Sequence, residues 1–181
     1  MRLKNLESEL QVVAGFDKPK IQLEQYCTTP HLAARMLYTA HTVYDDIESK
    51  VIADFGCGCG ILSYNLALDI DNDALQIAKE NCSEFEVDVE FILADLISTS
   101  TDHLQNKVDT IVMNPPFGTK NNEGIDIIFL KKAIEIATTS VYSLHKSSTR
   151  EYIREKAKNW GVECEVLAEM KVFIFAKSFT Y

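Results

Sequence analysis

VIADFGCGCG, residues 51–60, joins a short apolar segment to a turn in which every second residue is glycine. The first half, 51–55, predicts a buried strand, and the segment after Gly60 is capable of forming a helix. Glycines at such a junction let the backbone turn sharply and approach a ligand closely, with N–H groups pointing at it. The stretch therefore predicts a ligand-binding loop at the end of a strand, although an ordinary tight turn can have the same pattern.

Strand and helix patterns alternate on both sides of this stretch. Apolar runs predict further strands at 87–93, 110–113, 141–144 and within 165–175. Helical spacing predicts a short amphipathic helix within 3–13 and longer helices at 30–44, 73–85, 125–139 and 148–160. Alternation of strand and helix implies parallel strands joined by crossovers, so the predicted fold class is α/β with a doubly wound, Rossmann-like sheet.

Length and composition place the chain among ordinary globular proteins. Its 181 residues are about the size of one domain, so we expect a single domain, 1–181. Apolar residues make up 46% and charged residues 25%, which is a globular balance. No apolar run approaches the roughly 20 residues of a membrane span, and the N-terminus lacks a signal-peptide core. We therefore expect an intracellular protein that does not enter a membrane.

The cysteines and the net charge restrict the function further. Five scattered cysteines favour reduced thiols in the cytosol or the nucleus. Cys57 and Cys59 stand closer together than zinc ligands usually do, and no second pair lies near them, so no metal site is expected. The net charge of −9 argues against broad electrostatic attraction to nucleic acid. A nucleic-acid substrate would require a small basic patch, or a partner protein that supplies the basic surface.

Acidic residues follow the glycine turn and the next predicted strand. Asp69 and Asp71 lie downstream of the turn, where a carboxylate can accept hydrogen bonds from both hydroxyls of a ribose. Asp95 follows the strand at 87–93 and offers a carboxylate to an adenine amine. Each acid taken singly could equally be a solvated strand end or a helix cap. Together with the glycine turn, the acids favour a nucleoside ligand.

Asn114-Pro115-Pro116-Phe117 follows the strand at 110–113 and so lies at the carboxyl edge of the sheet, where α/β proteins bind ligands. The prolines fix the backbone, so the Asn114 amide and the Pro115 carbonyl can be held at one point. Two acceptors suit an amine with two N–H bonds, because they can aim its lone pair at a methyl group. Phe117 can stack on a base. The segment predicts methyl transfer to a ring amine; a proline-stiffened loop without a role is the alternative.

Several stretches resemble the family of adenine-N6 methyltransferases that act on small-subunit ribosomal RNA, and the resemblance covers nearly the whole chain. The stretches are LEQY (23–26), PHLAARMLYT (30–39), YDDIE (44–48), ADFGCGCG (53–60), MNPPFGTKNN (113–122) and VYSLHKSSTRE (141–151). The fold that the resemblance implies is the Rossmann-like methyltransferase sheet, with S-adenosylmethionine as the cofactor.

The resemblance also implies the site residues and the partners. It implies cofactor contacts from Gln25, Thr28, Gly56, Cys59, Ile61, Asp69, Asp95 and Leu96, and catalysis by Asn114, Pro115, Pro116 and Phe117. The arm 1–29 would thus contribute to the cofactor site. Further implications are a ribosomal RNA substrate, a heterodimer with a small zinc-binding activator protein that several methyltransferases share, and a place in the nucleus, nucleolus included, and the cytoplasm.

The crossover after the glycine turn departs from this family. Only eight residues, Ile61 to Leu68, separate Gly60 from Asp69, whereas a parallel crossover takes a dozen or more including its helix. A full helix and a full strand cannot share that length. We expect a shortened or distorted second strand, with the chain either running directly into Asp69 or displacing it. In both cases we expect the adenosine pocket to lose one wall.

The C-terminus departs as well. After Glu169 the family continues through a lysine-rich segment and a final strand, where this chain has only Lys171, Lys177 and an end at Tyr181. An incomplete C-terminal hairpin and an unpaired edge strand are therefore expected. The strand at 87–93 is a second candidate edge that could pair with another chain.

Three functions are open at this point. The first is methyl transfer to the N6 amine of an adenine in small-subunit ribosomal RNA. The second is methylation of a protein glutamine, whose side-chain nitrogen also carries two N–H bonds. Such enzymes usually have tyrosine at the position of Phe117, so Phe117 and the segment 145–148 favour RNA. The third is an inactive, cofactor-poor binding module, which the short crossover would explain.

Overall fold

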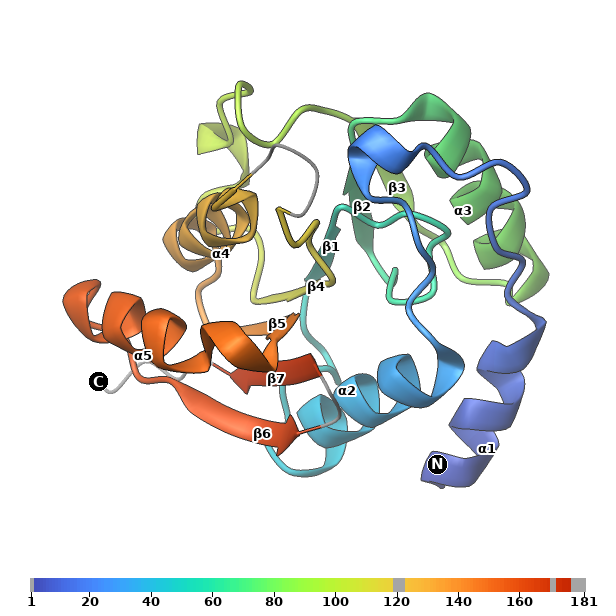
Figure 1. Ribbon diagram of the computed structural model, residues 1–181. Helices are drawn as coiled ribbons and strands as arrows, with labels where there is room; N and C mark the ends of the chain where they lie inside the picture. Colours follow the sequence, from blue (N-terminus) through green and yellow to red (C-terminus); the bar gives the residue numbers. More distant parts are fainter. Residues whose placement is uncertain (1, 119–122, 170–171, 177–181) are drawn as a thin grey trace.

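A central sheet of seven strands runs through the part of the chain that the structure describes, residues 2–118, 123–169 and 172–176 (Figure 1). In this computed structural model the strand order is β3-β2-β1-β4-β5-β7-β6. The parallel strands are β1 (Ile52–Phe55), β2 (Leu66–Asp69), β3 (Glu90–Leu93), β4 (Thr110–Met113) and β5 (Ser140–Lys146). The order reverses between β1 and β4, where doubly wound sheets bind their ligands. The predicted α/β class is confirmed.

Helices cover both faces of the sheet (Figure 1). One face carries α1 (Leu3–Glu9), α2 (Pro30–Thr42) and α3 (Asn72–Glu84), and the other carries α4 (Ile125–Ile136) and α5 (Arg150–Asn159). Single 3-10 turns are η1 (Leu10–Val12), η2 (Ile21–Leu23), η3 (Asp102–Leu104) and η4 (Ser147–Thr149). Successive strand residues point to opposite faces. On β4, Ile111 and Met113 therefore join the core under α4, while Val112 joins the core under α2.

The predicted elements are present, with ends that differ by a few residues. Thr29 caps α2, since its hydroxyl accepts a hydrogen bond from the Leu32 backbone N–H at 3.4 Å, and Pro30 occupies the first turn. The helix ends at Thr42 rather than at residue 44. The residues 119–122 of the resembling stretch, and Lys171, Lys177 and Tyr181, lie outside the described residues.

The crossover between β1 and β2 contains turns and no helix. β1 ends at Phe55 and β2 begins at Leu66, so ten residues make the connection. The backbone N–H groups of Gly56 and Cys57 both donate to the Leu68 carbonyl, at 2.8 and 3.0 Å, so the loop folds back directly onto β2. β2 has four residues, like β1, and pairs in regular parallel register with β1 and β3. The expectation of a distorted second strand is wrong, because the chain keeps the strand and omits the helix.

The C-terminal hairpin is complete in the described residues, contrary to the sequence-based expectation. β7 (Val172–Ala176) pairs antiparallel with β5, and β6 (Glu165–Glu169) pairs antiparallel with β7. The region 165–175, where one strand was predicted, thus contains the two strands β6 and β7. β7 covers the edge of β5, which leaves β3 and β6 as the outer strands of the sheet.

Gly60 tests how tightly the short crossover packs. Its φ is +83°, and an added Cβ would lie 2.9 Å from Ala78 Cβ on α3. Gly60→Ala should lower the free energy of unfolding by more than about 2 kcal/mol, because backbone strain and a steric clash add. Gly161→Ala is the control: its φ is +71° but nothing lies within 4 Å, so about 1 kcal/mol of strain is expected. Urea unfolding measures both variants, and equal losses would contradict close packing of the crossover on α3.

Candidate active site

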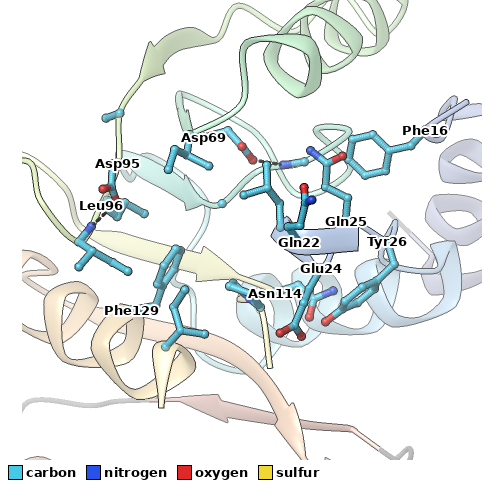
Figure 2. A pocket seen from close by; sticks show the side chains of 18 residues that line it. Phe16, Gln22, Glu24, Gln25, Tyr26, Asp69, Asp95, Leu96, Asn114 and Phe129 are labelled. Atoms are coloured by element: carbon cyan, nitrogen blue, oxygen red, sulfur yellow. Dashed lines mark hydrogen bonds between the residues drawn. The ribbon is translucent and has the colours of Figure 1, made fainter. Parts of the chain in front are cut away.

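Two adjoining cavities lie at the carboxyl ends of β1, β2 and β4, where the strand order reverses. They share Tyr26, Gly56, Gly58 and Asn114 in their walls. Figure 2 shows the larger one, with the N-terminal arm on one side and residues that follow β3, together with Phe129 of α4, on the other. Segments far apart in the sequence therefore enclose one space, and residues of the arm form one of its walls.

The glycine loop forms the floor between the two cavities. Gly56 has a φ of +71°, and a Cβ there would meet the Phe129 ring at 3.3 Å, so glycine is required both by the turn and by the close approach of α4. The Gly58 N–H donates to Asp69 Oδ2 at 2.9 Å. Cys59 is buried, and its carbonyl accepts a hydrogen bond from the Asn81 amide at 2.8 Å. Hydrogen bonds to β2 and α3 thus hold the loop in place.

Asp69 stays at the site and is not displaced by the short crossover. It is nearly buried, and its second carboxylate oxygen accepts from the Asp71 N–H at 2.9 Å. Burial raises the pKa of Asp69, although hydrogen bonds from the backbone of Asp71 and Gly58 act against this shift. Each oxygen retains a lone pair for a ligand hydroxyl.

Asp71 ties the N-terminal arm to the sheet. Lys20 Nζ donates to Asp71 Oδ1 at 2.6 Å, and Gln25 Nε2 donates to Asp71 Oδ2 at 2.6 Å. Burial disfavours the charged carboxylate, but the hydrogen bonds from Lys20 and Gln25 outweigh it and lower the pKa of Asp71. Gln25 therefore reaches the cavity wall as predicted, while Asp71 holds the arm in place rather than lining the cavity.

Asp95 and Leu96 form part of the opposite wall. The Asp95 side chain accepts from the Ser98 hydroxyl at 2.7 Å and from the Ile97 N–H at 2.9 Å, and these bonds lower its pKa. Asp95 is thus also the cap of its own turn, which was the alternative reading of this acid. Leu96 is buried. The expected loss of an adenosine wall is not found, since Ile70, Leu96, Ile97 and Phe129 all line the cavity.

Asn114 lies at the junction of the two cavities with one half of its amide unused. Its Nδ2 donates to Thr28 Oγ1 at 2.9 Å, and Thr28 is buried at the start of the segment that leads into α2. Its Oδ1 is buried and has no hydrogen-bond partner among the described residues. A buried acceptor without a partner costs about 1–3 kcal/mol, so this oxygen marks a place for a donor that a ligand supplies.

Phe117 lies outside the two cavities, on an aromatic surface next to them. Its ring lies 5.6 Å from that of Tyr26, centroid to centroid, and Lys146 Nζ lies 5.7 Å from the Phe117 ring centroid. The backbone N–H of Phe117 donates to Glu24 Oε2 at 3.0 Å. The arm therefore holds the loop 114–117 in place and also lines the larger cavity.

The structure brings most of the predicted site residues together. The predicted residues that line one or other of the two cavities are Gln25, Thr28, Gly56, Cys59, Ile61, Asp69, Asp95, Leu96, Asn114 and Pro116. Pro115 is buried, and neither it nor Phe117 lines these cavities. No specific role was predicted from the sequence for Glu24, Tyr26, Ile70 or Phe129. Glu24 and Tyr26 stand in the resembling stretch LEQY, which is the only signal that pointed to them.

His145 does not face an RNA-binding surface. It is fully buried, with Nε2 2.8 Å from the Ser143 hydroxyl and Nδ1 3.1 Å from Asp126 Oδ2. Residues 141, 143 and 145 of β5 point toward α4, so the period of the strand puts His145 inside. The use of the segment 145–148 as evidence for RNA is therefore wrong for His145, and Lys146, over Phe117, is the residue of this segment that reaches the site.

Within the described residues no group of three or more His, Cys, Asp or Glu side chains is arranged to hold a metal ion. Among the same residues no helix has the length and apolarity needed to cross a membrane.

Fold and site together define a Rossmann-like methyltransferase. The sequence model of the methyltransferase small domain matches residues 32–140, which include the glycine loop and Asn114. A candidate RNA methyltransferase from Pyrococcus horikoshii superposes with a TM-score of 0.85 at 28% identity, over 100% of this chain and 99% of that chain.

Two curated relatives are more specific. The rRNA N(6)-adenosine-methyltransferase METTL5 of Danio rerio is 51% identical over 94% of this chain and 87% of its own length. Its Drosophila melanogaster counterpart is 42% identical over 97% of this chain and 87% of its own length. The chain belongs to the METTL5 family of methyltransferases.

Asp54 predicts a pH dependence of stability. It is fully buried behind the glycine loop, and burial raises its pKa to about 7, against a hydrogen bond from Ser63. The unfolded carboxyl titrates near pH 4, so between about pH 4 and 7 the folded state holds a proton that the unfolded state has lost. The free energy of unfolding should therefore fall across this range, by up to about 4 kcal/mol from this group, and level off above it.

Urea unfolding of Asp54→Asn between pH 4 and 8 checks this expectation. The asparagine can still accept the Ser63 hydrogen bond but cannot ionise, so its stability should fall less than that of the unsubstituted chain. Asp88→Asn removes an exposed carboxyl and is the control. Parallel curves for the Asp54 variant and the unsubstituted chain would show that Asp54 is ionised throughout.

Proposed function

We propose that this protein transfers a methyl group from S-adenosylmethionine to the N6 amine of an adenine in ribosomal RNA, and that the RNA is that of the small subunit. The observation that carries the proposal is the buried, unpartnered Oδ1 of Asn114 at the junction of the two cavities. A ring amine can donate a hydrogen bond to this oxygen. A carbon atom that received the methyl group would have no N–H or O–H bond to donate and would leave the oxygen unpaired. The names of the METTL5 relatives support the adenine-N6 chemistry and the ribosomal RNA.

The residues present fit S-adenosylmethionine. A nucleoside needs apolar cover for its base and charged or polar acceptors for its hydroxyls and amine. Ile70, Leu96 and Phe129 supply the cover in the larger cavity, and Asp69 and Asp95 supply the acceptors. The smaller cavity, between Thr28, Asp54 and the glycine loop, is polar enough for the amino-acid end of the cofactor. When bound, the cofactor would supply an electrophilic methyl group.

The acceptor loop, residues 114–117, can raise the nucleophilicity of the adenine amine. An adenine amine is a weak nucleophile because its lone pair is delocalised into the ring. Asn114 Oδ1 would accept one of its N–H bonds, and the Pro115 carbonyl the other, which favours a pyramidal nitrogen with a directed lone pair. The amide nitrogen of Asn114 donates to the Thr28 hydroxyl, which leaves the amide oxygen for the amine. Phe117 and Tyr26 offer ring faces for stacking, which is worth about 1–3 kcal/mol per base.

Two other functions find less support. Methylation of a glutamine amide would use the same Asn114 oxygen, but the Tyr26–Phe117 ring pair with Lys146 beside it suits a flat base followed by phosphates better than a peptide amide. The inactive binding module was expected because the short crossover would damage the site. The cavity that Asp69, Leu96 and Phe129 line speaks against such damage.

The proposal includes a partner at the β3 edge. β3 is an outer strand whose residues Glu90 and Leu93 are exposed, and Leu93, Ile97 and Ile70 are 57%, 44% and 52% exposed. An unpaired strand with apolar side chains beside it invites β-augmentation by another chain. We propose that a small zinc-binding activator protein pairs there and supplies basic surface to a chain of net charge −9. We also propose that residues 1–181 act as one domain. We propose that the protein works in the nucleus, nucleolus included, and in the cytoplasm.

Asn114→Ala should reduce methyl transfer to ribosomal RNA by about 100-fold or more, since the variant loses the acceptor for the amine. Its affinity for S-adenosylmethionine, measured by calorimetry, should change less than about threefold. Thr28→Val keeps the Asn114 oxygen but frees the amide to rotate, so an intermediate loss is expected. Transfer that survives in Asn114→Ala would end the proposed role of this residue. Loss of cofactor binding in both variants would point instead to collapse of the site.

Leu93→Arg tests the partner at the β3 edge. Placing a charge on the exposed end of the strand should weaken binding to the activator protein at least tenfold in pull-down or calorimetry, because the apolar contact is lost. Ile128→Arg, at a similarly exposed apolar residue of α4, is the matched control and should bind normally. Equal binding of both variants, or full activity of the chain as a stable monomer, would contradict the proposed edge pairing.

A further inference from the structure

An apolar groove lies on the face of the sheet where the short crossover contains no helix. Its volume is about 460 Å³, within the range of ligand and peptide sites. The walls come from α1, α2, the crossover and α3, that is, from the elements that flank the position of the omitted helix. The site cavities do not include it, although Ile61 and Leu62 line both the groove and the smaller site cavity.

Most of the side chains that line the groove are apolar, and several of them are partly exposed. Leu6, Leu37, Phe85 and Val87 are half-buried along its walls, and Tyr64 at its rim is 47% exposed. A parallel crossover normally covers this part of a sheet with a helix. The groove therefore lies where a crossover helix would pack, in a chain whose connection between β1 and β2 contains no helix.

The charges on the groove select the occupant. Glu9 of α1 and Glu48, in the connection before β1, are its charged lining residues, both are exposed, and no described Lys or Arg lines it. His41 also lines it, and its buried Nδ1 has no hydrogen-bond partner among the described residues. An apolar groove with acidic rims is complementary to a helix that has one apolar face and basic flanks.

We propose that this groove docks an amphipathic, basic α-helix from a partner protein, which supplies in trans the helix that the crossover lacks. Anchoring side chains at positions i, i+3 or i+4 and i+7 of the partner helix would enter the groove between α2 and α3. Basic residues beside them would pair with Glu9 and Glu48. The surface is on the opposite side of the sheet from α4 and separate from the β3 edge, so a helix could dock while the edge partner is bound.

A labelled synthetic peptide of about 14 residues tests the proposal with the full chain. The peptide carries leucines at helical spacing and lysines at the other positions, and the matched control peptide carries glutamates in place of the lysines. Fluorescence anisotropy should show saturable binding of the lysine peptide and at least tenfold weaker binding of the glutamate peptide. Absence of saturable binding, or equal binding of both peptides, would overturn the proposal.

Variants separate docking in the groove from general attraction to an acidic protein. Glu9→Lys combined with Glu48→Lys, and separately Leu37→Asp, should each weaken the lysine peptide at least tenfold. Glu151→Lys combined with Glu155→Lys changes the net charge equally on α5 and should have little effect. If the α5 variant weakens binding as much as the groove variant, the attraction is not specific and the proposal fails.

A third variant fills the groove from within the chain. About ten helix-forming residues inserted between Tyr64 and Asn65 leave the hydrogen bonds of Ser63 to Asp54 and of Asn65 to Ile52 in place. The inserted helix should occupy the groove and abolish peptide binding, while circular dichroism shows added helix. Unchanged peptide affinity in this folded variant would place the peptide elsewhere and overturn the proposal.

Discussion

The hydrogen bonds between the glycine loop and the end of β2 determine the site. Gly56 and Cys57 donate to the Leu68 carbonyl, and Gly58 donates to Asp69, so these hydrogen bonds hold the loop after β1 against the end of β2. The whole connection from β1 to β2 takes ten residues and contains no helix. Further hydrogen bonds connect the end of β2 to the N-terminal arm. Asp69 orients Asp71, Asp71 binds Gln25, and the segment that follows Gln25 places Thr28 against Asn114. Polar contacts, with the short stretch of chain from Gln25 to Thr28 between them, thus link the end of β2 to Asn114.

Asn114 shows how that set serves chemistry rather than stability. Stability alone would favour a partner for every buried polar atom, because an unsatisfied acceptor costs about 1–3 kcal/mol. Thr28 satisfies the donor half of the amide and leaves the acceptor half buried and unpaired. In this arrangement the oxygen of the amide faces away from Thr28. The cost of the unpaired oxygen is recovered only when a donor arrives, which is how a preorganised site binds an amine.

Periodicity and turn chemistry predicted the local structure, and long-range contacts decided the rest. The strand at 110–113 and the helix that begins at Pro30 follow from residue pattern alone. The length of the crossover showed that helix and strand could not both fit, but only the bonds from the loop to Leu68 show which one was kept. His145 was misplaced because the predicted strand stopped one residue short of it. Glu24 reaches Phe117 across 93 residues, a distance that no local pattern covers.

The omitted helix leaves the site intact because the two faces of the sheet have separate cores. Ala53 and Phe55 of β1 pack under α4, and that core contains none of the residues that line the groove. The larger cavity is walled by the loop after β3, by α4 and by residues 16–26 of the arm. None of these belongs to the connection between Gly60 and β2, so omitting a helix there takes away none of these walls. What the omission exposes is the apolar side of α2 and α3. A chain can therefore keep its acceptor chemistry while offering a surface that its own crossover would otherwise cover.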